Sequence, residues 1–138
     1  MCGIAGVVRR EGPVAGDPSR LIQRLSAAMA HRGPDGDGSW LSPDRDVLFV
    51  HRRLAIIDPR PEANQPMASA DGRLVLVFNG EVYNYRELRG ELAARGERFR
   101  TESDTEVLLR LIEREGPSSL ARVRGMFALA CWNAAERS

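Results

Sequence analysis

The hydrophobic residues of the chain form two kinds of pattern, short continuous runs and runs at helical spacing. Continuous apolar runs that favour strands occupy residues 2–8, 46–51, 73–78 and 125–132, and residues 53–58 indicate a strand-like extension of the second run. Hydrophobic residues spaced three and four apart predict helices from Pro18 to about Ala30, between Asn84 and Gly96, and between Ser103 and Gly116. The pattern therefore mixes strands with helices, and we expect helical layers to cover the strands.

Each predicted helix begins at a residue that can cap it. Asp17 precedes Pro18, a residue that suits the first position of a helix. The other two helix starts have a capping residue followed three positions later by an acidic residue, which predicts two capping boxes, Asn84 with Glu87 and Ser103 with Glu106.

Turn-forming residues separate these elements. Segments 31–38 and 58–66 are rich in Gly, Pro and Asp and predict irregular loops, and the pair Asn79–Gly80 predicts a turn that ends the third strand. A short helical turn is expected around Leu120. The run 125–132 is almost continuously apolar, which predicts a strand covered on both faces. Such a strand is normally followed by more chain, so we expect residues 1–138 to form one domain that is incomplete at its C-terminal side.

Composition places the chain among ordinary globular proteins. Its 138 residues are 43% hydrophobic and 28% charged, and 20 basic and 19 acidic residues leave a net charge of +1. That balance gives no reason to expect a nucleic acid or a membrane surface as partner. Two cysteines cannot form a disulfide framework, and the sequence shows neither a secretory signal nor an apolar run of membrane-spanning length. We therefore expect a cytoplasmic protein with reduced thiols.

Cys2 is the first candidate for chemistry. A small buried hydrophobic residue at the start of a strand is the simpler interpretation of this thiol. Its position suggests another, because removal of Met1 would leave Cys2 with a free α-amine whose reference pKa of about 7.7–8.0 suits a base. One residue would then carry both a nucleophile and a candidate base.

Three other stretches admit both a structural and a functional interpretation. Asn79–Gly80 is either a turn or a pair of donors for an oxyanion, one from the amide and one from the next backbone N–H. Arg53 is either a solvated strand-end residue, as we expect of Arg52, or a bidentate partner for a carboxylate. Asp104 suits the first turn of a helix and could also bind an ammonium group.

The histidines do not form a convincing site. His31 and His51 have no second ligand at a spacing typical of zinc, and Cys131 lies within an apolar strand and is expected to belong to the core. The sequence also lacks a phosphate-binding glycine fingerprint between a strand and a helix. No metal site is predicted.

Taken together, seven ordered stretches resemble the glutaminase domain of the glutamine-hydrolysing asparagine synthetases, a class II glutamine amidotransferase. They are MCGIAGVV, HRGPDG, HRRLAIID, NQPM, FNGEVYN, SDTE and GMFALACW, and they span Met1 to about Asn133. Related amidotransferases carry a Gly-His-x-Arg-x-Ala-Thr pattern where this chain has HRRLAIID, which favours the asparagine synthetase branch. The family's later Arg-Asp-x-x-Gly-x-x-Pro-Leu segment does not occur in the sequence.

The resemblance implies an α+β fold of the N-terminal nucleophile type, a four-layer αββα sandwich with two antiparallel sheets. It implies that Cys2 is the nucleophile and that its α-amine is the base. Asn79 and Gly80 would form the oxyanion hole. The segment HRGPDG would be a structural loop near the site without a catalytic role.

The resemblance also implies a glutamine-binding pocket. Arg53 would bind the α-carboxylate of glutamine and Asp104 its α-ammonium group. Four further residues would line the pocket, namely Glu81 and, with their backbone, Leu54, Ile56 and Ile57.

The implied activity is hydrolysis of glutamine to glutamate and ammonia through a γ-glutamyl thioester on Cys2. The ammonia would feed an ATP-dependent amidation, the synthesis of asparagine, on a synthetase domain that this chain lacks. ATP and Mg²⁺ are expected only on that domain, and this chain is expected to need no cofactor. A homodimer is left open. Two alternatives are a noncatalytic glutamine-binding remnant of such an enzyme and a general cysteine hydrolase.

Overall fold

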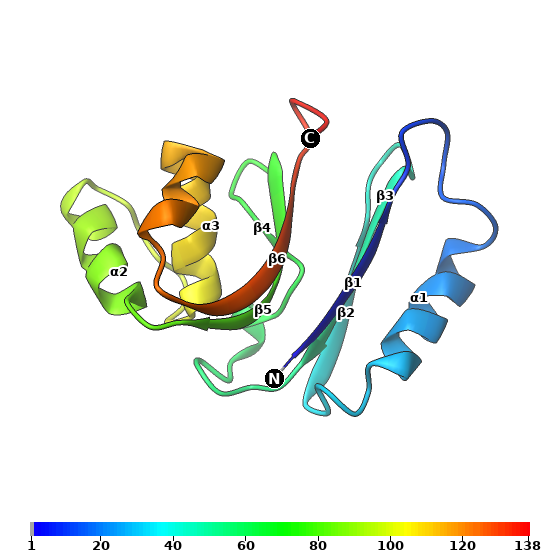
Figure 1. The fold of residues 1–138 in the computed structure, drawn as a ribbon, viewed down its shortest axis with the longest axis horizontal. Coiled ribbons are helices and arrows are strands. Elements are labelled where there is room, and N and C mark those ends of the chain that lie inside the picture. Colours follow the sequence, from blue (N-terminus) through cyan, green and yellow to red (C-terminus); the bar gives the residue numbers. More distant parts are fainter. Residues whose placement is uncertain (1) are drawn as a thin grey trace.

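The computed structural model describes residues 2–138 as two antiparallel sheets between helical layers (Figure 1). Sheet A has the strand order β1-β3-β2 and sheet B the order β4-β5-β6. The strands are β1 (Gly3–Val8), β2 (Gly36–Leu41), β3 (Val47–Arg53), β4 (Met67–Ala68), β5 (Leu74–Val82) and β6 (Gly125–Asn133). The helices are α1 (Pro18–Ala28), α2 (Tyr85–Ala94) and α3 (Asp104–Glu115), with short 3₁₀ turns at Pro61–Ala63 and Pro117–Arg122.

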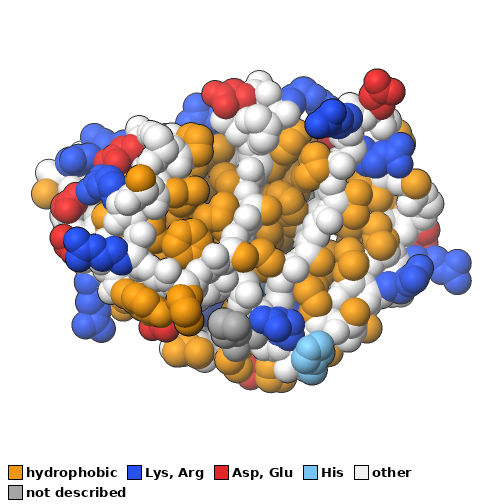
Figure 2. Space-filling view, in the orientation of Figure 1, with side chains coloured by type: hydrophobic (Ala, Val, Ile, Leu, Met, Phe, Trp, Pro, Cys, Tyr) orange, Lys and Arg blue, Asp and Glu red, His pale blue; other side chains and the backbone are white. Residues whose placement is uncertain are grey.

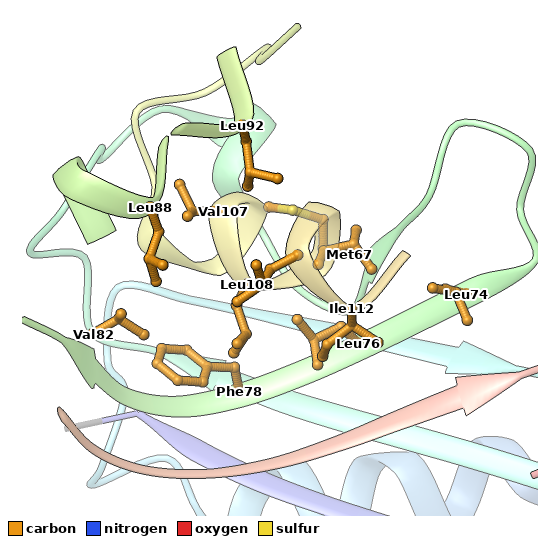
Figure 3. Close-up of a cluster of buried hydrophobic side chains, with 12 residues drawn as sticks. Met67, Leu74, Leu76, Phe78, Val82, Leu88, Leu92, Val107, Leu108 and Ile112 are labelled. Carbon is orange, nitrogen blue, oxygen red and sulfur yellow. The ribbon is translucent and has the colours of Figure 1, made fainter. Parts of the chain in front are cut away.

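Three hydrophobic clusters hold the layers together. The first lies between sheet B and helices α2 and α3, where Leu76 and Phe78 of β5 lie below Leu108 and Ile112 of α3 (Figure 3). The second fills the space between the sheets and consists of Val47, Phe49, Val75, Val77 and Trp132. The third joins α1 to the outer face of sheet A through Val14, Leu48 and Val50. Successive side chains of β3 and β5 point to opposite faces of their sheets. Each strand thus packs one face against the other sheet and the other face against helices.

This arrangement confirms the predicted α+β fold with two antiparallel sheets covered by helices. α1 begins after Asp17, whose side chain accepts a 2.9 Å hydrogen bond from the Ser19 N–H as expected. α3 begins after Ser103 and ends at Gly116, also as predicted. The helical turn expected around Leu120 is the 3₁₀ segment Pro117–Arg122.

The capping boxes predicted for α2 and α3 are wrong. The Asn84 side chain makes no cap bond and instead joins Arg122 O and Arg124 N–H. Glu106 accepts from the backbone of Arg100 and Thr101, so the Ser103 cap lacks its reciprocal half. Burial of each leucine on the inner faces of these helices is worth about 2 kcal/mol. A cap contributes only about 1 kcal/mol. Packing of the buried leucines can therefore stabilise a helix even when its capping side chain bonds to another part of the chain.

Two further predictions are corrected by pairing between strands. The turn expected at Asn79–Gly80 does not form, because β5 continues to Val82 and pairs Asn79 with Ala128 and Gly80 with Phe127. The loop expected at 31–38 ends early, since β2 begins at Gly36 and pairs with Arg53 of β3. The strand-like extension predicted for 53–58 is also absent, as residues after Arg53 leave the sheet.

β6 is not covered on both faces as its sequence suggested. Met126 is 68% exposed and Phe127 36% exposed, and the first four residues of β6 are all exposed. Among residues 2–138, β6 pairs with β5 alone, so its outer edge and part of one face have no neighbour. Figure 2 shows hydrophobic side chains gathered over the middle of the molecule on the side viewed.

Candidate active site

A cavity of about 230 Å³ is lined by Cys2, the residue directly before β1. Eight of the nine predicted site residues line it: Cys2, Arg53, Leu54, Ile56, Ile57, Gly80, Glu81 and Asp104. They come from both sheets, the loop after β3 and the start of α3. The remaining residue, Asn79, precedes Gly80 on β5. A cavity below the usual 300–1,000 Å³ of drug-sized ligands suits a small metabolite.

Cys2 is held at the tip of β1 by backbone groups. Its Sγ lies 3.4 Å from the Leu54 N–H, from which it accepts, and 3.6 Å from the Leu54 carbonyl, to which it donates. The Arg32 Nε donates to the Cys2 carbonyl oxygen at 3.0 Å. The thiol is half-buried and faces the cavity. Removal of Met1, which the sequence interpretation needs, concerns a residue outside those described and stays a prediction.

The loop containing HRGPDG positions the site more directly than the sequence indicated. Besides the bond from Arg32 to Cys2, Asp35 Oδ2 accepts a 2.8 Å hydrogen bond from the Ala55 N–H. This loop therefore fixes both the nucleophile candidate and the segment that follows Arg53. The turn-rich composition located the loop, but composition could not show which backbone groups its side chains would reach.

Arg53 is buried at the end of β3, with its guanidinium against the loop that follows. It donates to the Arg60 carbonyl at 2.9 Å, to Asn64 Oδ1 at 2.7 Å and to the Asp58 carbonyl. A guanidinium has five N–H groups, so two of them donate to no residue of the described part of the chain and are available to a ligand. Arg52, expected to be a solvated residue, instead donates to the Gly33 carbonyl at 3.0 Å.

The Gly80 N–H lies on an open edge of β5. N–H groups of alternate strand residues point to the same edge. On the edge away from β6, Gln65 Oε1 accepts from the Phe78 N–H at 2.6 Å and Asp104 Oδ2 accepts from the Val82 N–H at 3.0 Å. Gly80 lies midway and lines the cavity, and no side chain of residues 2–138 accepts from its N–H. This donor is therefore available to a ligand.

Only glycine fits at position 80. A Cβ there would lie 2.3 Å from the Met126 carbonyl oxygen and 2.5 Å from the Phe127 Cα, because β6 approaches closely. Asn79 has the opposite orientation and continues the row of Val75 and Val77, which face sheet A. Its Oδ1 is buried without a hydrogen-bond partner among the described residues. This oxygen is an acceptor and could not stabilise an oxyanion, so a donor role for Asn79 rests on its Nδ2, which donates to no described residue.

Two carboxylates form the acidic side of the cavity. Burial raises the pKa of Asp104, and the negative charge of Glu81 raises it further, while the bond from the Val82 N–H opposes this shift. A cation bound between them would favour the ionised form of Asp104. The Arg53 guanidinium also lines the cavity. The cavity therefore holds a partner for the α-carboxylate and another for the α-ammonium group of a free amino acid.

The remaining candidates from the sequence lie elsewhere. His31 is exposed, and Cys131 is half-buried against the core beside α3, where burial raises the pKa of its thiol to about 11. Among residues 2–138 no group of three His, Cys, Asp or Glu residues could hold a metal ion. No helix in this part of the chain is long and apolar enough to cross a membrane.

His51 is buried in β3, and its Nε2 has no hydrogen-bond partner among residues 2–138. Burial and the charge of Arg53 lower its pKa from 6.5 to about 4. A lowered pKa means that the unfolded chain binds the proton more readily, so stability falls as pH drops from 6.5 through 4. The shift corresponds to about 3 kcal/mol.

We therefore expect the free energy of unfolding to fall by about 3 kcal/mol in this window, on the shift of His51 alone. Urea unfolding at several pH values, with wild type compared to His51→Gln, isolates this contribution. Carboxylates with lowered pKa, such as Asp46 and Glu115, lose their contributions mainly below this window. The same pH slope in both proteins would contradict the assignment to His51.

The comparisons with known proteins agree with this geometry. A family model described as glutamine amidotransferase domain matches residues 1–138. The chain is 44% identical over 135 residues to asparagine synthetase [glutamine-hydrolyzing] 1 of Bacillus subtilis, covering 96% of this chain and 21% of that protein. It is 42% identical over 149 residues to a putative asparagine synthetase [glutamine-hydrolyzing] of Mycobacterium tuberculosis, covering 99% and 23%.

The fold has a counterpart among solved structures. The glutamine phosphoribosylpyrophosphate amidotransferase of B. subtilis, complexed with ADP and GMP, superposes with a TM-score of 0.77 at 24% identity, over 97% of this chain and 35% of that chain. At this identity the likeness concerns the fold. The chain spans about a fifth of the length of the curated relatives that it matches. Because the family model matches the whole sequence, the chain belongs to the glutamine amidotransferase domain family.

Proposed function

We propose that this chain hydrolyses glutamine to glutamate and ammonia, with Cys2 as nucleophile. The observation that carries the proposal is the meeting of the Cys2 thiol and the open Gly80 N–H in one cavity. A thiol beside a fixed, unoccupied backbone donor is the arrangement that attack on an amide carbonyl requires. The family assignment supports glutamine as the amide.

Glutamine fits the charges of the cavity. The two N–H groups of Arg53 that donate to no described residue would bind the α-carboxylate, and Asp104 with Glu81 would bind the α-ammonium group. Leu54, Ile56 and Ile57 would line the space between. These contacts would hold glutamine by its α-carboxylate and α-ammonium groups. Its side-chain amide would then extend toward Cys2.

The reaction then proceeds in two stages. The Cys2 amine takes the thiol proton, and Sγ attacks the amide carbon, so that an S–C bond forms and the carbonyl electrons move to oxygen. The Gly80 N–H and the Asn79 amide stabilise this oxyanion. The C–N bond breaks as the nitrogen takes the proton held by the Cys2 amine, so that ammonia departs and a γ-glutamyl thioester remains on Cys2. Water attacks the thioester, the C–S bond breaks, and glutamate and the thiol are released.

The relatives suggest where the ammonia goes. Because they are named glutamine-hydrolysing asparagine synthetases and are about five times longer, we propose that a C-terminal synthetase domain consumes the ammonia to make asparagine. ATP and Mg²⁺ would act on that domain. A cytoplasmic location and a homodimer stay predictions.

Labelling of Cys2 tests the proposed function. We expect the intact mass of the purified chain to show loss of Met1, and a glutamine-like diazo-ketone to add once, at Cys2, with glutamine protecting. The same preparation should release ammonia from glutamine. Folded chain that retains Met1 would contradict the amine mechanism. Folded, processed chain that binds glutamine without releasing ammonia would support the noncatalytic alternative.

Arg53→Ala is expected to raise KM for glutamine by at least about 100-fold, because two charge-assisted hydrogen bonds of roughly 1.5–3 kcal/mol each are lost. The effect on kcat should be smaller, since these contacts act before and during the reaction alike. Steady-state ammonia release measures both constants. Arg24→Ala, which alters an exposed arginine on α1, serves as the control. An unchanged KM in Arg53→Ala would remove this residue from the pocket.

A further inference from the structure

Gln65 lies at the point where the two sheets and α3 meet. Gln65 is 7% exposed and lines the cavity. Neither the sequence patterns nor the proposed reaction assigns it a role. Gln65 belongs to the segment between β3 and β4, which connects sheet A to sheet B (Figure 1).

The first contact of Gln65 satisfies a backbone N–H of β5 that no strand among residues 2–138 pairs with. β4 has two residues and pairs only with Val75 and Leu76, so the edge of β5 is open beyond that point. The Gln65 side chain caps this edge, because its Oε1 accepts from the Phe78 N–H at 2.6 Å. Phe78 is two residues before Gly80, so this bond fixes the strand next to the free oxyanion donor.

The second contact reaches the acidic side of the cavity. Gln65 Nε2 donates to Thr105 Oγ1 at 3.2 Å, and Thr105 follows Asp104 in the first turn of α3. Asp104 Oδ2 in turn accepts from the Val82 N–H, two residues after Gly80. One amide side chain and one carboxylate therefore hold β5 on either side of Gly80, and both are tied to the start of α3.

The third contact is with sheet A. A Cβ on Gly38 would lie 2.0 Å from the Gln65 carbonyl oxygen, so the backbone of Gln65 packs directly on β2 where only glycine fits. Gly38 pairs with His51 of β3, the strand that carries Arg53. Gln65 thus touches the sheet that presents Cys2 and Arg53 and, through its side chain, the sheet that presents Gly80.

We propose that Gln65 is a positioning residue that sets the placement of the Gly80 N–H relative to Cys2. The inference rests on the proposed glutamine hydrolysis. Gln65 acts through Phe78 and Thr105, and its effect is on the tetrahedral oxyanion, since the free donor is needed only when that charge develops.

Gln65→Met tests the proposal, because methionine is unbranched, similar in length and without hydrogen-bonding groups that could replace the amide. We expect kcat for glutamine to fall by about 10- to 100-fold with little change in KM, as expected when a donor is misplaced by a fraction of an ångström. Gln23→Met, an exposed change on α1, is the matched control and should match wild type.

Two inhibitors separate positioning from loss of structure. Glutamate reports binding in the ground state, whereas a glutamine analogue with an aldehyde in place of the carboxamide forms a tetrahedral adduct with Cys2. In Gln65→Met the inhibition constant of the aldehyde should rise in step with the loss of kcat/KM, while that of glutamate stays within about twofold. Equal increases for both inhibitors, or an unchanged kcat, would overturn the inference.

A second pair of variants decides the matter if Gln65→Met does not fold. Thr105→Val removes the acceptor of the Nε2 bond and keeps the shape, and it should lower kcat about fivefold. Thr105→Ser keeps the hydroxyl and should restore activity to within about twofold of wild type. Equal kcat values in the two variants would contradict the proposal. Wild-type chain that releases no ammonia would instead contradict the proposed function, and this inference with it.

Discussion

Cys2→Ala is expected to abolish ammonia release from glutamine while leaving glutamine bound. The variant loses the only thiol that lines the cavity, and no other described residue there can form the thioester. In a serine protease, loss of the nucleophile costs on the order of 10⁶ in kcat, and we expect a loss of similar size here. The contacts of Arg53 and Asp104 with substrate are retained, so affinity for glutamine should change little. Ammonia release and calorimetric titration with glutamine measure the two effects.

Cys131→Ala is the matched control for this variant. It removes the other thiol of the chain, which packs against the core beside α3 and has a pKa raised by burial. We expect its ammonia release to equal that of wild type within about twofold, with at most a stability loss of about 1 kcal/mol from the lost packing. Ammonia release that survives in Cys2→Ala but is lost in Cys131→Ala would show that Cys131, and not Cys2, is the nucleophile, and would contradict our proposal.

Asn79→Ala is expected to lower kcat by about 10²–10³, the usual cost of removing one donor from an oxyanion hole. KM should stay nearly constant, since the amide would bind the oxygen most strongly in the transition state. Asn79→Asp should lose at least as much, because a carboxylate keeps the shape but repels the developing negative charge. Steady-state kinetics on the three proteins measures both constants.

The control for this series is Asn133→Ala, which alters an asparagine at the far end of β6. We expect it to retain wild-type kcat. A loss below about threefold in Asn79→Ala would leave Gly80 as the sole donor in the proposed oxyanion hole. A raised KM with unchanged kcat would place Asn79 in ground-state binding.

Sequence patterns predicted the elements whose signals are local. The Asp17–Pro18 start of α1 and the Gly116 end of α3 depend on nearby groups, and both were predicted correctly. Patterns failed where a distant group competed for the same residue. Glu106 follows the spacing of a capping box, yet it accepts from Arg100 and Thr101 because the preceding loop folds back over α3.

The pair Asn79–Gly80 shows the same limit in a strand. As a dipeptide it favours a turn, but nine residue pairs with β6 hold β5 in register through this point. Glycine is required here for the close approach of β6, which sequence reasoning could not foresee. The apolar run of β6 likewise predicted burial on both faces, whereas burial depends on neighbours that local sequence does not provide.

The sequence by itself determined the chemistry that is available. It placed a cysteine next to the N-terminus, an asparagine and a glycine after an apolar strand, and an arginine and an aspartate at element ends, and its ordered motifs indicated the family. Only the tertiary structure decided that eight of the nine candidate site residues share one cavity. It also decided that, among residues 2–138, two N–H groups of Arg53 and the N–H of Gly80, between Gln65 and Asp104, have no acceptor. The physical reason is that the chemistry of a residue is fixed by its own side chain, whereas a backbone N–H stays free only if no group from a distant part of the chain accepts its hydrogen bond.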